Sequence, residues 1–243
     1  MILFRFFALA TMLVCAAMPS FAKDGGVIVF GGTGRLGAPI VKLLLQAGED
    51  VTVFARKDSP KDRLAGLKVD YVVGDLSDDK SIAAAFSAKK YRVAIDASAQ
   101  RGETSKIDKF YETITRSIIT HAKRTGVKLF IHHGSIGAGE NIKEVPFLKN
   151  FPQSPGMIDK GLAEKVIIES GVPYVIIRNG LIPQDPQPPA TGRGYLTSDH
   201  STFGEITRDD LAILTVDSIY NPARWNKIYH AIDPDLHLRT EKQ

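Results

Sequence analysis

Cysteine is almost absent from this chain, with Cys15 the only one among 243 residues. A single cysteine excludes an intramolecular disulfide and any metal site built on paired cysteines. The chain also lacks an H-x-x-x-H pair and a G-x-S-x-G run, which are typical of zinc-binding helices and of serine hydrolases. We therefore predict no metal site and no serine-hydrolase site.

A strong excess of charge of one sign is missing as well. Lys and Arg total 31 against 27 Asp and Glu, so the net charge is +4, and without Arg5 residues 23–243 carry +3 (4 − 1). No basic run is interleaved with aromatic residues, so a nucleic-acid partner is not predicted. The length of residues 23–243 suits one domain with a substantial core.

The first 22 residues follow the order of a secretory signal. Arg5 precedes an apolar run from Phe6 to Met18, and the small residues Ser20 and Ala22 stand just before Lys23. The run is about a dozen residues long, whereas a membrane-spanning helix needs about 20. We expect cleavage after Ala22 and export to the periplasm or out of the cell. An uncleaved membrane anchor is the alternative.

Short apolar runs alternate with helical patterns along residues 23–243. Strands are predicted over residues 27–30, 50–56, 69–75, 91–99, 127–135 and 173–180, and helices over residues 36–48, 77–86, 105–125 and 157–171. Ser77 is the expected N-cap of the second helix. This alternation predicts an α/β fold with a Rossmann-type, doubly wound parallel sheet in a single domain.

Two irregular stretches interrupt the pattern, at residues 137–155 and 183–204. Both follow strand ends on the side where open α/β sheets bind ligands. They either cover a substrate site or form ordinary surface loops.

The stretch GGTGRLG places Gly31, Gly34 and Gly37 between a predicted strand and a predicted helix. In this context the first glycine permits a tight turn, the second lets the backbone approach a pyrophosphate, and the third lets the helix pack closely on the sheet. The predicted cofactor-binding residues are Gly31, Thr33, Gly34, Arg35, Leu36, Gly37, Arg56, Asp75, Leu76 and Ala97.

The second strand ends in Arg56 and Lys57, where NAD sites usually place an acidic residue for the ribose 2′-hydroxyl. A cation at this position favours the 2′-phosphate of NADP over NAD. Arg35 is expected to stack on the adenine or to join this phosphate clamp. Asp75 either reaches the adenine or caps the following helix, a role for which Ser77 competes.

The stretches VIVFGGTGRLG, VVGDLSD and VKLFIHHGSIGAG resemble the atypical short-chain dehydrogenase/reductases, in particular their NmrA-like, NAD(P)H-binding branch. KGLAEKVIIESGVPYVIIRNGLI, ITRDDLAILTVDSI and IYHAIDPD are similar to the later helices and strands of that branch. The resemblance covers nearly all of residues 23–243. It implies a Rossmann domain that binds a nicotinamide cofactor.

The resemblance also implies a catalytic set. In the wider superfamily a Tyr donates a proton, a Lys four residues later lowers the pKa of that Tyr, and a Ser steadies the substrate carbonyl. Ser135 and Lys160 match the Ser and the Lys, and Glu164 follows as in the family, but Gly156 stands where the Tyr is expected. Some relatives use the Lys alone as the acid, and Lys160 is predicted to do so if burial lowers its pKa.

Four other side chains are alternative proton donors. His132 and His133 end the fifth strand, where strand alternation points one inward and one outward. Tyr111 lies on the 105–125 helix, and Tyr195 lies in the 183–204 stretch. A structural role is the competing interpretation for each of them.

Three functions fit these motifs. The first is an NADP-linked oxidoreductase that acts on a small carbonyl or enone through Ser135 and Lys160. The second is a sensor, assembly or scaffold protein that binds NADPH without turnover and acts on a partner protein. The third is a degenerate fold that binds no dinucleotide, because a chain exported unfolded leaves its cofactor behind. A membrane partner is expected only if residues 1–22 are retained.

Overall fold

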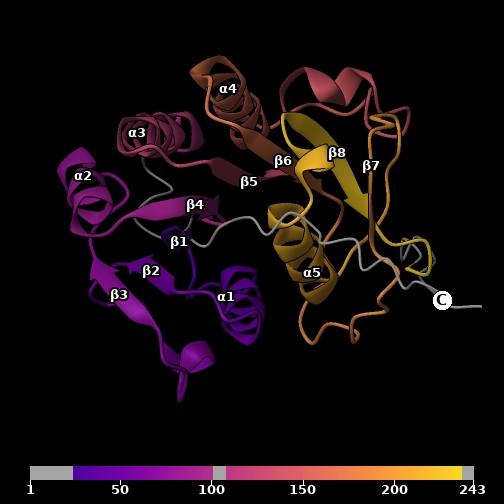
Figure 1. Ribbon diagram of the computed structural model, residues 1–243. Coiled ribbons are helices and arrows are strands. Elements are labelled where there is room, and N and C mark those ends of the chain that lie inside the picture. Colours follow the sequence, from indigo (N-terminus) through magenta and orange to yellow (C-terminus); the bar gives the residue numbers. More distant parts are fainter. Residues whose placement is uncertain (1–23, 101–107, 237–243) are drawn as a thin grey trace, which may run out of the picture.

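A computed structural model of the protein describes residues 24–100 and 108–236 (Figure 1). The segment 1–22, with its predicted signal, lies outside the described residues, as does the expected start of a helix at Ser105. The described chain forms one eight-stranded sheet in the order β3-β2-β1-β4-β5-β6-β8-β7. Adjacent strands are parallel except β7 and β8, which are antiparallel. The predicted doubly wound α/β fold is confirmed.

The strands and helices have the following bounds. The strands are β1 Gly26–Phe30, β2 Val51–Ala55, β3 Asp70–Val73, β4 Tyr91–Asp96, β5 Leu129–Ser135, β6 Tyr174–Asn179, β7 Tyr195–Thr197 and β8 Lys227–Ile232. The α-helices are α1 Gly37–Gln46, α2 Asp79–Ala88, α3 Phe110–Thr125, α4 Pro155–Ser170 and α5 Arg208–Ile219. Short 3₁₀ turns lie at η1 Asp62–Leu64, η3 Gly139–Lys143 and η4 Pro222–Arg224.

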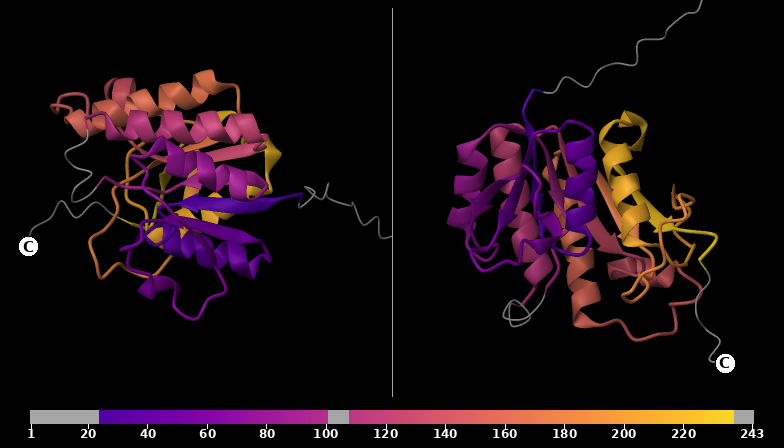
Figure 2. Two further views of the ribbon diagram at one scale, coloured as in Figure 1. Left: turned by 90° about the vertical axis from the view of Figure 1, so that its left-hand side faces the viewer. Right: turned by 90° about the horizontal axis from the view of Figure 1, so that it is seen from below.

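Helices cover both faces of the sheet. Helices α2, α3 and α4 form one layer, and α1 and α5 form the other (Figures 1 and 2). Because both faces are covered, β1 and β2 are buried along their whole length and consist almost entirely of apolar residues. None of the described helices is long and apolar enough to cross a bilayer.

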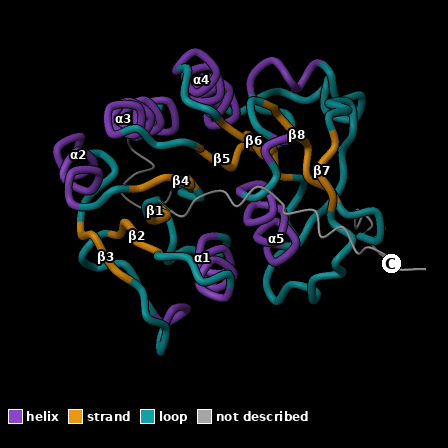
Figure 3. The backbone as a smooth tube through the Cα atoms, viewed as in Figure 1, coloured by secondary structure: helices purple, strands orange, loops and turns teal. Residues whose placement is uncertain are grey.

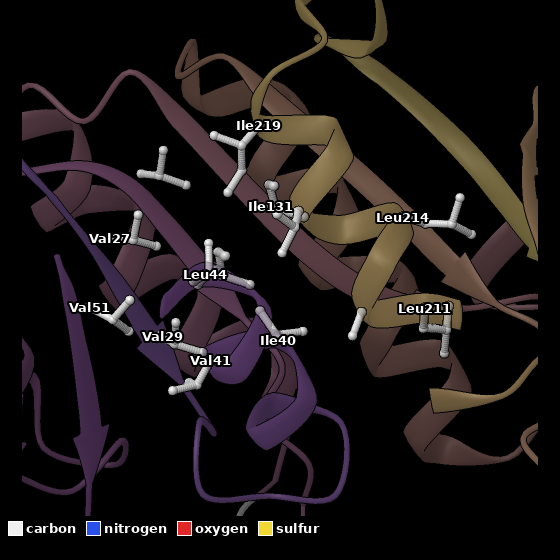
Figure 4. Packing of buried hydrophobic residues seen from close by; sticks show 14 of the residues in the cluster. Val27, Val29, Ile40, Val41, Leu44, Val51, Ile131, Leu211, Leu214 and Ile219 are labelled. Atoms are coloured by element: carbon white, nitrogen blue, oxygen red, sulfur yellow. The ribbon is translucent and has the colours of Figure 1, made fainter. Parts of the chain in front are cut away.

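Strand alternation divides the core into two clusters. Val27, Val29 and Ile131 point toward the layer of α1 and α5, where they meet Leu44 and Leu211 (Figure 4). The neighbouring residues of the same strands, among them Ile28, Phe30 and Phe130, point toward α2, α3 and α4. Strands β1 and β5 therefore contribute apolar side chains to both clusters, and this makes their register in the sheet specific.

Two local features differ from the predictions. The N-cap of α2 is Asp78, whose carboxylate accepts the amide hydrogen of Lys80 at 3.1 Å, and not Ser77. Ser77 instead donates its amide and its hydroxyl to Asp75, at 2.8 and 2.7 Å. The predicted loop 183–204 contains the short edge strand β7, which pairs with β8. Long loops gather around β7 and β8 (Figure 3).

Candidate cofactor and active site

A cavity of about 380 Å³ lies at the carboxyl ends of the parallel strands. The chain runs outward from β1 to β3 in one direction and from β4 to β6 in the other, so β1 and β4 flank the switch point of the sheet. Open α/β sheets bind their ligands at this point. The predicted residues that line the cavity are Gly31, Thr33, Gly34, Arg35, Leu36, Arg56, Asp75, Leu76, Ala97, Ser135 and Lys160.

The glycine loop is as tight as the motif predicts. Gly31 has φ +74°, and a Cβ there would lie 2.6 Å from the carbonyl oxygen of Ala97. The amide of Gly34 donates to the carbonyl of Gly31 at 2.9 Å, which closes the turn. Gly37 does not line the cavity, because its role is packing: a Cβ there would lie 2.2 Å from the oxygen of Gly31. A side chain at these positions would force the loop open.

The N-terminus of α1 is the one α-helix start in the described chain without a carboxylate or hydroxyl on its backbone amides. Its N-cap, Leu36, makes no side-chain cap bond, and its first turn has no acidic residue. The other α-helices are capped by side chains of Asp78, Ser154, Thr207 and, for α3, Asp159 of α4. The positive dipole end of α1, which no carboxylate or hydroxyl caps, therefore suits a phosphate group.

Two arginines stand at the mouth of the cavity. Arg56 follows β2 and lies 3.6 Å from Asp58, with nearly half of its side chain exposed. Arg35 forms a 2.8 Å ion pair with Asp185 of the 183–204 loop, and Asp185 also accepts from Arg208 of α5 at 2.9 Å. A single carboxylate thus bridges two cations that line the cavity.

Ser135 and Lys160 meet inside the cavity. The ammonium of Lys160 on α4 donates to the hydroxyl of Ser135 at the end of β5, at a distance of 2.6 Å. Burial lowers the pKa of Lys160, while the negative charges of Glu164 and Asp96 partly offset this effect. Burial thus lowers the pKa of Lys160, which is the condition under which this lysine was expected to act as the acid, and that role stays a prediction.

Glu164 lies one turn after Lys160 on α4 and is held by a buried arginine. Arg178 of β6 donates to both carboxylate oxygens of Glu164, with its Nη2 at 2.8 Å from Oε2 and its Nε at 3.1 Å from Oε1. Both side chains are at least nine-tenths buried. This paired geometry fixes the negative charge that faces Lys160.

The two histidines lie on opposite faces of β5, as alternation predicts, but both are buried, because helices cover both faces. His132 hydrogen-bonds Asp96 at 3.1 Å. His133 lines the cavity, its ring is held between Asn179 and Thr215 at 3.0 Å each, and burial lowers its pKa to about 4. A histidine with this pKa is neutral at physiological pH and is a poor proton donor there.

The two remaining predicted proton donors, Tyr195 and Tyr111, lie at different distances from the cavity. Tyr195 lies on the edge strand β7 and is not among the residues that line the cavity. Tyr111 lies beside Lys160, with its ring centroid 5.0 Å from the ammonium nitrogen. At Gly156, where the tyrosine was expected, an added Cβ would have no atom within 4 Å.

Several residues of the cavity were missed by sequence reasoning. Asn179 ends β6, Gly180 and Ile182 lie in the segment that follows it, and Arg208 begins α5. Their only sequence signal was the rule that ligands gather at the carboxyl ends of parallel strands. That rule names the edge of the sheet but does not identify the side chains.

A family model for NAD(P)H-binding proteins matches residues 31–222, well over half of the chain. The chain belongs to the NAD(P)H-binding family. This membership agrees with the glycine loop and with the cavity that the loop borders. It confirms the resemblance to the atypical short-chain dehydrogenase/reductases.

The curated proteins that this chain matches have different named roles. The chain is 36% identical over 113 residues to sterol demethylase protein B of Methylococcus capsulatus, covering 46% of this chain and 34% of that protein. It is 24% identical to the NAD(P)H azoreductase of Xenophilus azovorans, covering 86% and 68%. It is 26% identical to the photosystem II assembly factor Ycf39 of Cyanophora paradoxa, covering 84% and 62%.

Among solved structures, the fold is similar to that of ChuY, an anaerobillin reductase from Escherichia coli O157:H7. The TM-score is 0.69 and the sequence identity 23%, over 88% of this chain and 99% of that one. The proteins to which this chain is similar thus include named reductases and a named assembly factor. The chain spans only about a third of sterol demethylase protein B and about two thirds of the other two relatives.

Proposed function

We propose that this protein is an NADP-linked oxidoreductase that acts on a small carbonyl or enone. The observation that carries the proposal is the 2.6 Å contact between Lys160 and Ser135, inside the same cavity that the glycine loop borders. A proton donor and a hydroxyl that can hold a carbonyl oxygen therefore lie within reach of a cofactor site.

The residues of the cavity fit a dinucleotide. The uncapped start of α1 and the turn at Gly31 and Gly34 would hold the pyrophosphate. Asp75 and Leu76 would border the adenosine, and Arg56 offers a cation for a 2′-phosphate. The preference for NADP over NAD rests on this cation.

The chemistry needs one proton from the protein. A bound reduced nicotinamide supplies hydride, which leaves the carbonyl oxygen or the enolate to be protonated. Lys160 would donate that proton from its ammonium, because its lowered pKa brings it closer to neutrality. Ser135 would hold the substrate oxygen by hydrogen bonding, in place of its present contact with Lys160.

The first experiment is a titration of residues 23–243 with NADPH and NADH, followed by the fluorescence of Trp225 and confirmed by calorimetry. NADPH is expected to bind at micromolar concentration and more tightly than NADH. Arg56→Glu should lose that preference, whereas Lys57→Glu, its exposed neighbour outside the cavity, is the matched control. Equal affinities for the two cofactors in the unmodified chain would overturn the NADP assignment.

Turnover is tested next with a panel of carbonyl and enone substrates. NADPH consumption should depend on substrate, and Lys160→Ala should abolish it while cofactor binding persists. Binding of NADPH without consumption across the panel would argue against the oxidoreductase.

The second candidate is a protein that binds NADPH without turnover and acts on a partner protein. Gly156 at the position of the superfamily's tyrosine favours it, as does the similarity to a photosystem II assembly factor. Gly156→Tyr separates the two functions, because it restores the superfamily's proton donor at a position where a Cβ has no atom within 4 Å. A rise in turnover supports an oxidoreductase site, while no turnover together with a partner captured in an NADPH-dependent manner supports the binding protein.

Export of the chain stays a prediction, since the signal lies in residues 1–22. If neither cofactor binds up to millimolar concentration, the glycine loop is a remnant and the fold is degenerate. That outcome would fit a chain exported without its cofactor.

A further inference from the structure

Lys160 has an aromatic neighbour on the adjacent helix α3. The ring of Tyr111 on α3 faces the ammonium of Lys160, with the nitrogen 5.0 Å from the ring centroid. The tyrosine hydroxyl accepts the backbone amide of Gln100 at 3.1 Å. Gln100 directly follows Ala99, which lines the cavity. The ring is therefore tied both to the lysine and to the loop after β4.

The residue before Lys160 holds Tyr111 from the other side. The carboxylate of Asp159 accepts the backbone amides of Tyr111 at 2.7 Å and Glu112 at 2.9 Å, and so caps α3 from α4. Asp159 is itself buried. Two adjacent residues of α4 thus contact Tyr111 of α3: Asp159 binds its backbone amide, and Lys160 lies over its ring. This double contact makes the placement of the ring specific.

We infer that Tyr111 is a positioning residue of this site, whose ring holds the Lys160 ammonium in place and favours its charged form, and that Asp159 sets the ring. The inference deepens the proposed oxidoreductase function, and the catalytic relevance of the contact rests on that function. The contact itself is testable without turnover. An aromatic face attracts a cation most where water is partly excluded, and Lys160 lies largely in the protein interior.

Other charges also face Lys160 and must be kept constant in a test. Glu164 of α4 and Asp96 of β4 favour the ammonium, and His133 of β5 responds to its charge. The hydroxyl of Ser135 is its hydrogen-bond acceptor. None of these groups is altered by a substitution at position 111.

The test measures the reactivity of the Lys160 amine directly. The full chain is labelled with trace acetic anhydride over a range of pH, and the peptide that contains Lys160 is quantified by mass spectrometry. The rate at neutral pH divided by the plateau rate at high pH reports the neutral fraction of the amine, independent of access. Tyr111→Leu should raise this ratio roughly three- to thirty-fold, because the ring no longer favours the ammonium.

Tyr111→Phe keeps the ring without the hydroxyl and should leave the ratio unchanged. Tyr71→Leu is the matched control elsewhere in the chain, since the ring of Tyr71 lies 4.4 Å from the ammonium of Lys61 on the surface. It should not affect Lys160. A change of the ratio in Tyr111→Phe equal to that in Tyr111→Leu, or no change in either variant, would overturn the inference.

Asp159→Asn provides a second, independent variant if Tyr111→Leu does not fold, as judged by its thermal melt. It weakens the cap on α3 and should raise the same ratio. Where Tyr111→Leu does fold, Asp159→Asn should add nothing in that background if Asp159 acts through the ring. An undiminished effect in that background would show that Asp159 acts on Lys160 directly and would contradict the second half of the inference.

Because labelling needs no substrate, a negative labelling result can be told apart from a lack of turnover. A positive labelling result without turnover would leave the lysine positioned in a protein that is not a reductase. In an active enzyme, Tyr111→Leu should shift the pH dependence of kcat to lower pH, and Tyr111→Phe should restore it.

Discussion

Replacing glycine with alanine is expected to have opposite effects on stability at two positions of α4. A Cβ on Gly161 would lie 2.3 Å from the Cα of Gly139 and 2.7 Å from its nitrogen, whereas ordinary contacts of a Cβ lie at 3.4–4 Å. Gly161→Ala therefore requires the backbones to separate by roughly 1 Å. The loop resists this movement, because the side-chain amide of Gln153 donates to the carbonyls of Gly137 and Gly139, both at 2.8 Å.

The expected magnitude combines two opposing effects. Overpacking costs about 1–3 kcal/mol, and alanine is favoured over glycine in a helix by about 0.5–1 kcal/mol. Gly161→Ala should therefore destabilise the fold by about 1–2 kcal/mol, which lowers Tm by about 4 °C in a domain of this size. Gly156→Ala on the same helix has nothing within 4 Å, and should raise Tm by about 2 °C.

The assay is a thermal melt by circular dichroism, repeated as a urea titration. Because both variants replace glycine with alanine in α4, the difference between them isolates the contact with Gly139. If Gly161→Ala raised Tm as Gly156→Ala does, the loop would yield freely, and the close approach would not constrain the helix that carries Lys160.

Three further predictions follow from charged and titratable groups. Glu164→Gln should cost about 3–5 kcal/mol in a urea titration, because it leaves the buried guanidinium of Arg178 without its counter-charge; a cost below about 1 kcal/mol would contradict this. Burial lowers the pKa of His133 from 6.5 to about 4, so the unfolded chain binds a proton in this window and the fold does not. The stability that the neutral His133 contributes is complete above pH 6.5 and is lost as the pH falls toward 4. His133→Gln should therefore flatten the dependence of the urea midpoint on pH. An unchanged dependence would refute the lowered pKa of His133. Asp185→Ala releases Arg35 and should tighten NADPH binding up to about five-fold at low salt, because a half-exposed pair contributes about 0–1 kcal/mol; weaker binding in a calorimetric titration would show that Asp185 supports the site.

The fold could be predicted from the sequence wherever a pattern is local. The buried strands are continuous apolar runs, and the glycine loop is a contiguous motif, so β1, α1 and the turn between them were predicted closely. The edge strand β7 was not predicted, because its three residues lie between prolines and glycines without alternation. The cap of α2 was assigned to Ser77 because Ser77 and Asp78 are both good caps, and only their hydrogen bonds separate them.

The residues of the site likewise divide into those in local motifs, which could be predicted, and those brought together by packing, which could not. Gly31 and Lys160 stand in motifs that could be recognised in the chain. The contact of Lys160 with Tyr111 joins residues 49 positions apart (160 − 111) on two helices. It depends on how α3 packs against α4, and no periodicity encodes it. Arg208 was missed for the same reason, since it begins α5 and lies far along the chain from the glycine loop.

The direction of the parallel strands has a practical consequence for how the protein is handled. Asp24 and Gly25 precede β1 at the amino edge of the sheet, where Asp24 pairs with Lys90 at 2.5 Å. The cavity opens at the carboxyl edge, where β8 also ends and Asp233 follows. A fusion partner, label or solid support joined ahead of Asp24 therefore attaches on the edge opposite the cavity. The same attachment after β8 starts from the edge that substrates would approach, so binding assays should use immobilisation through the amino end.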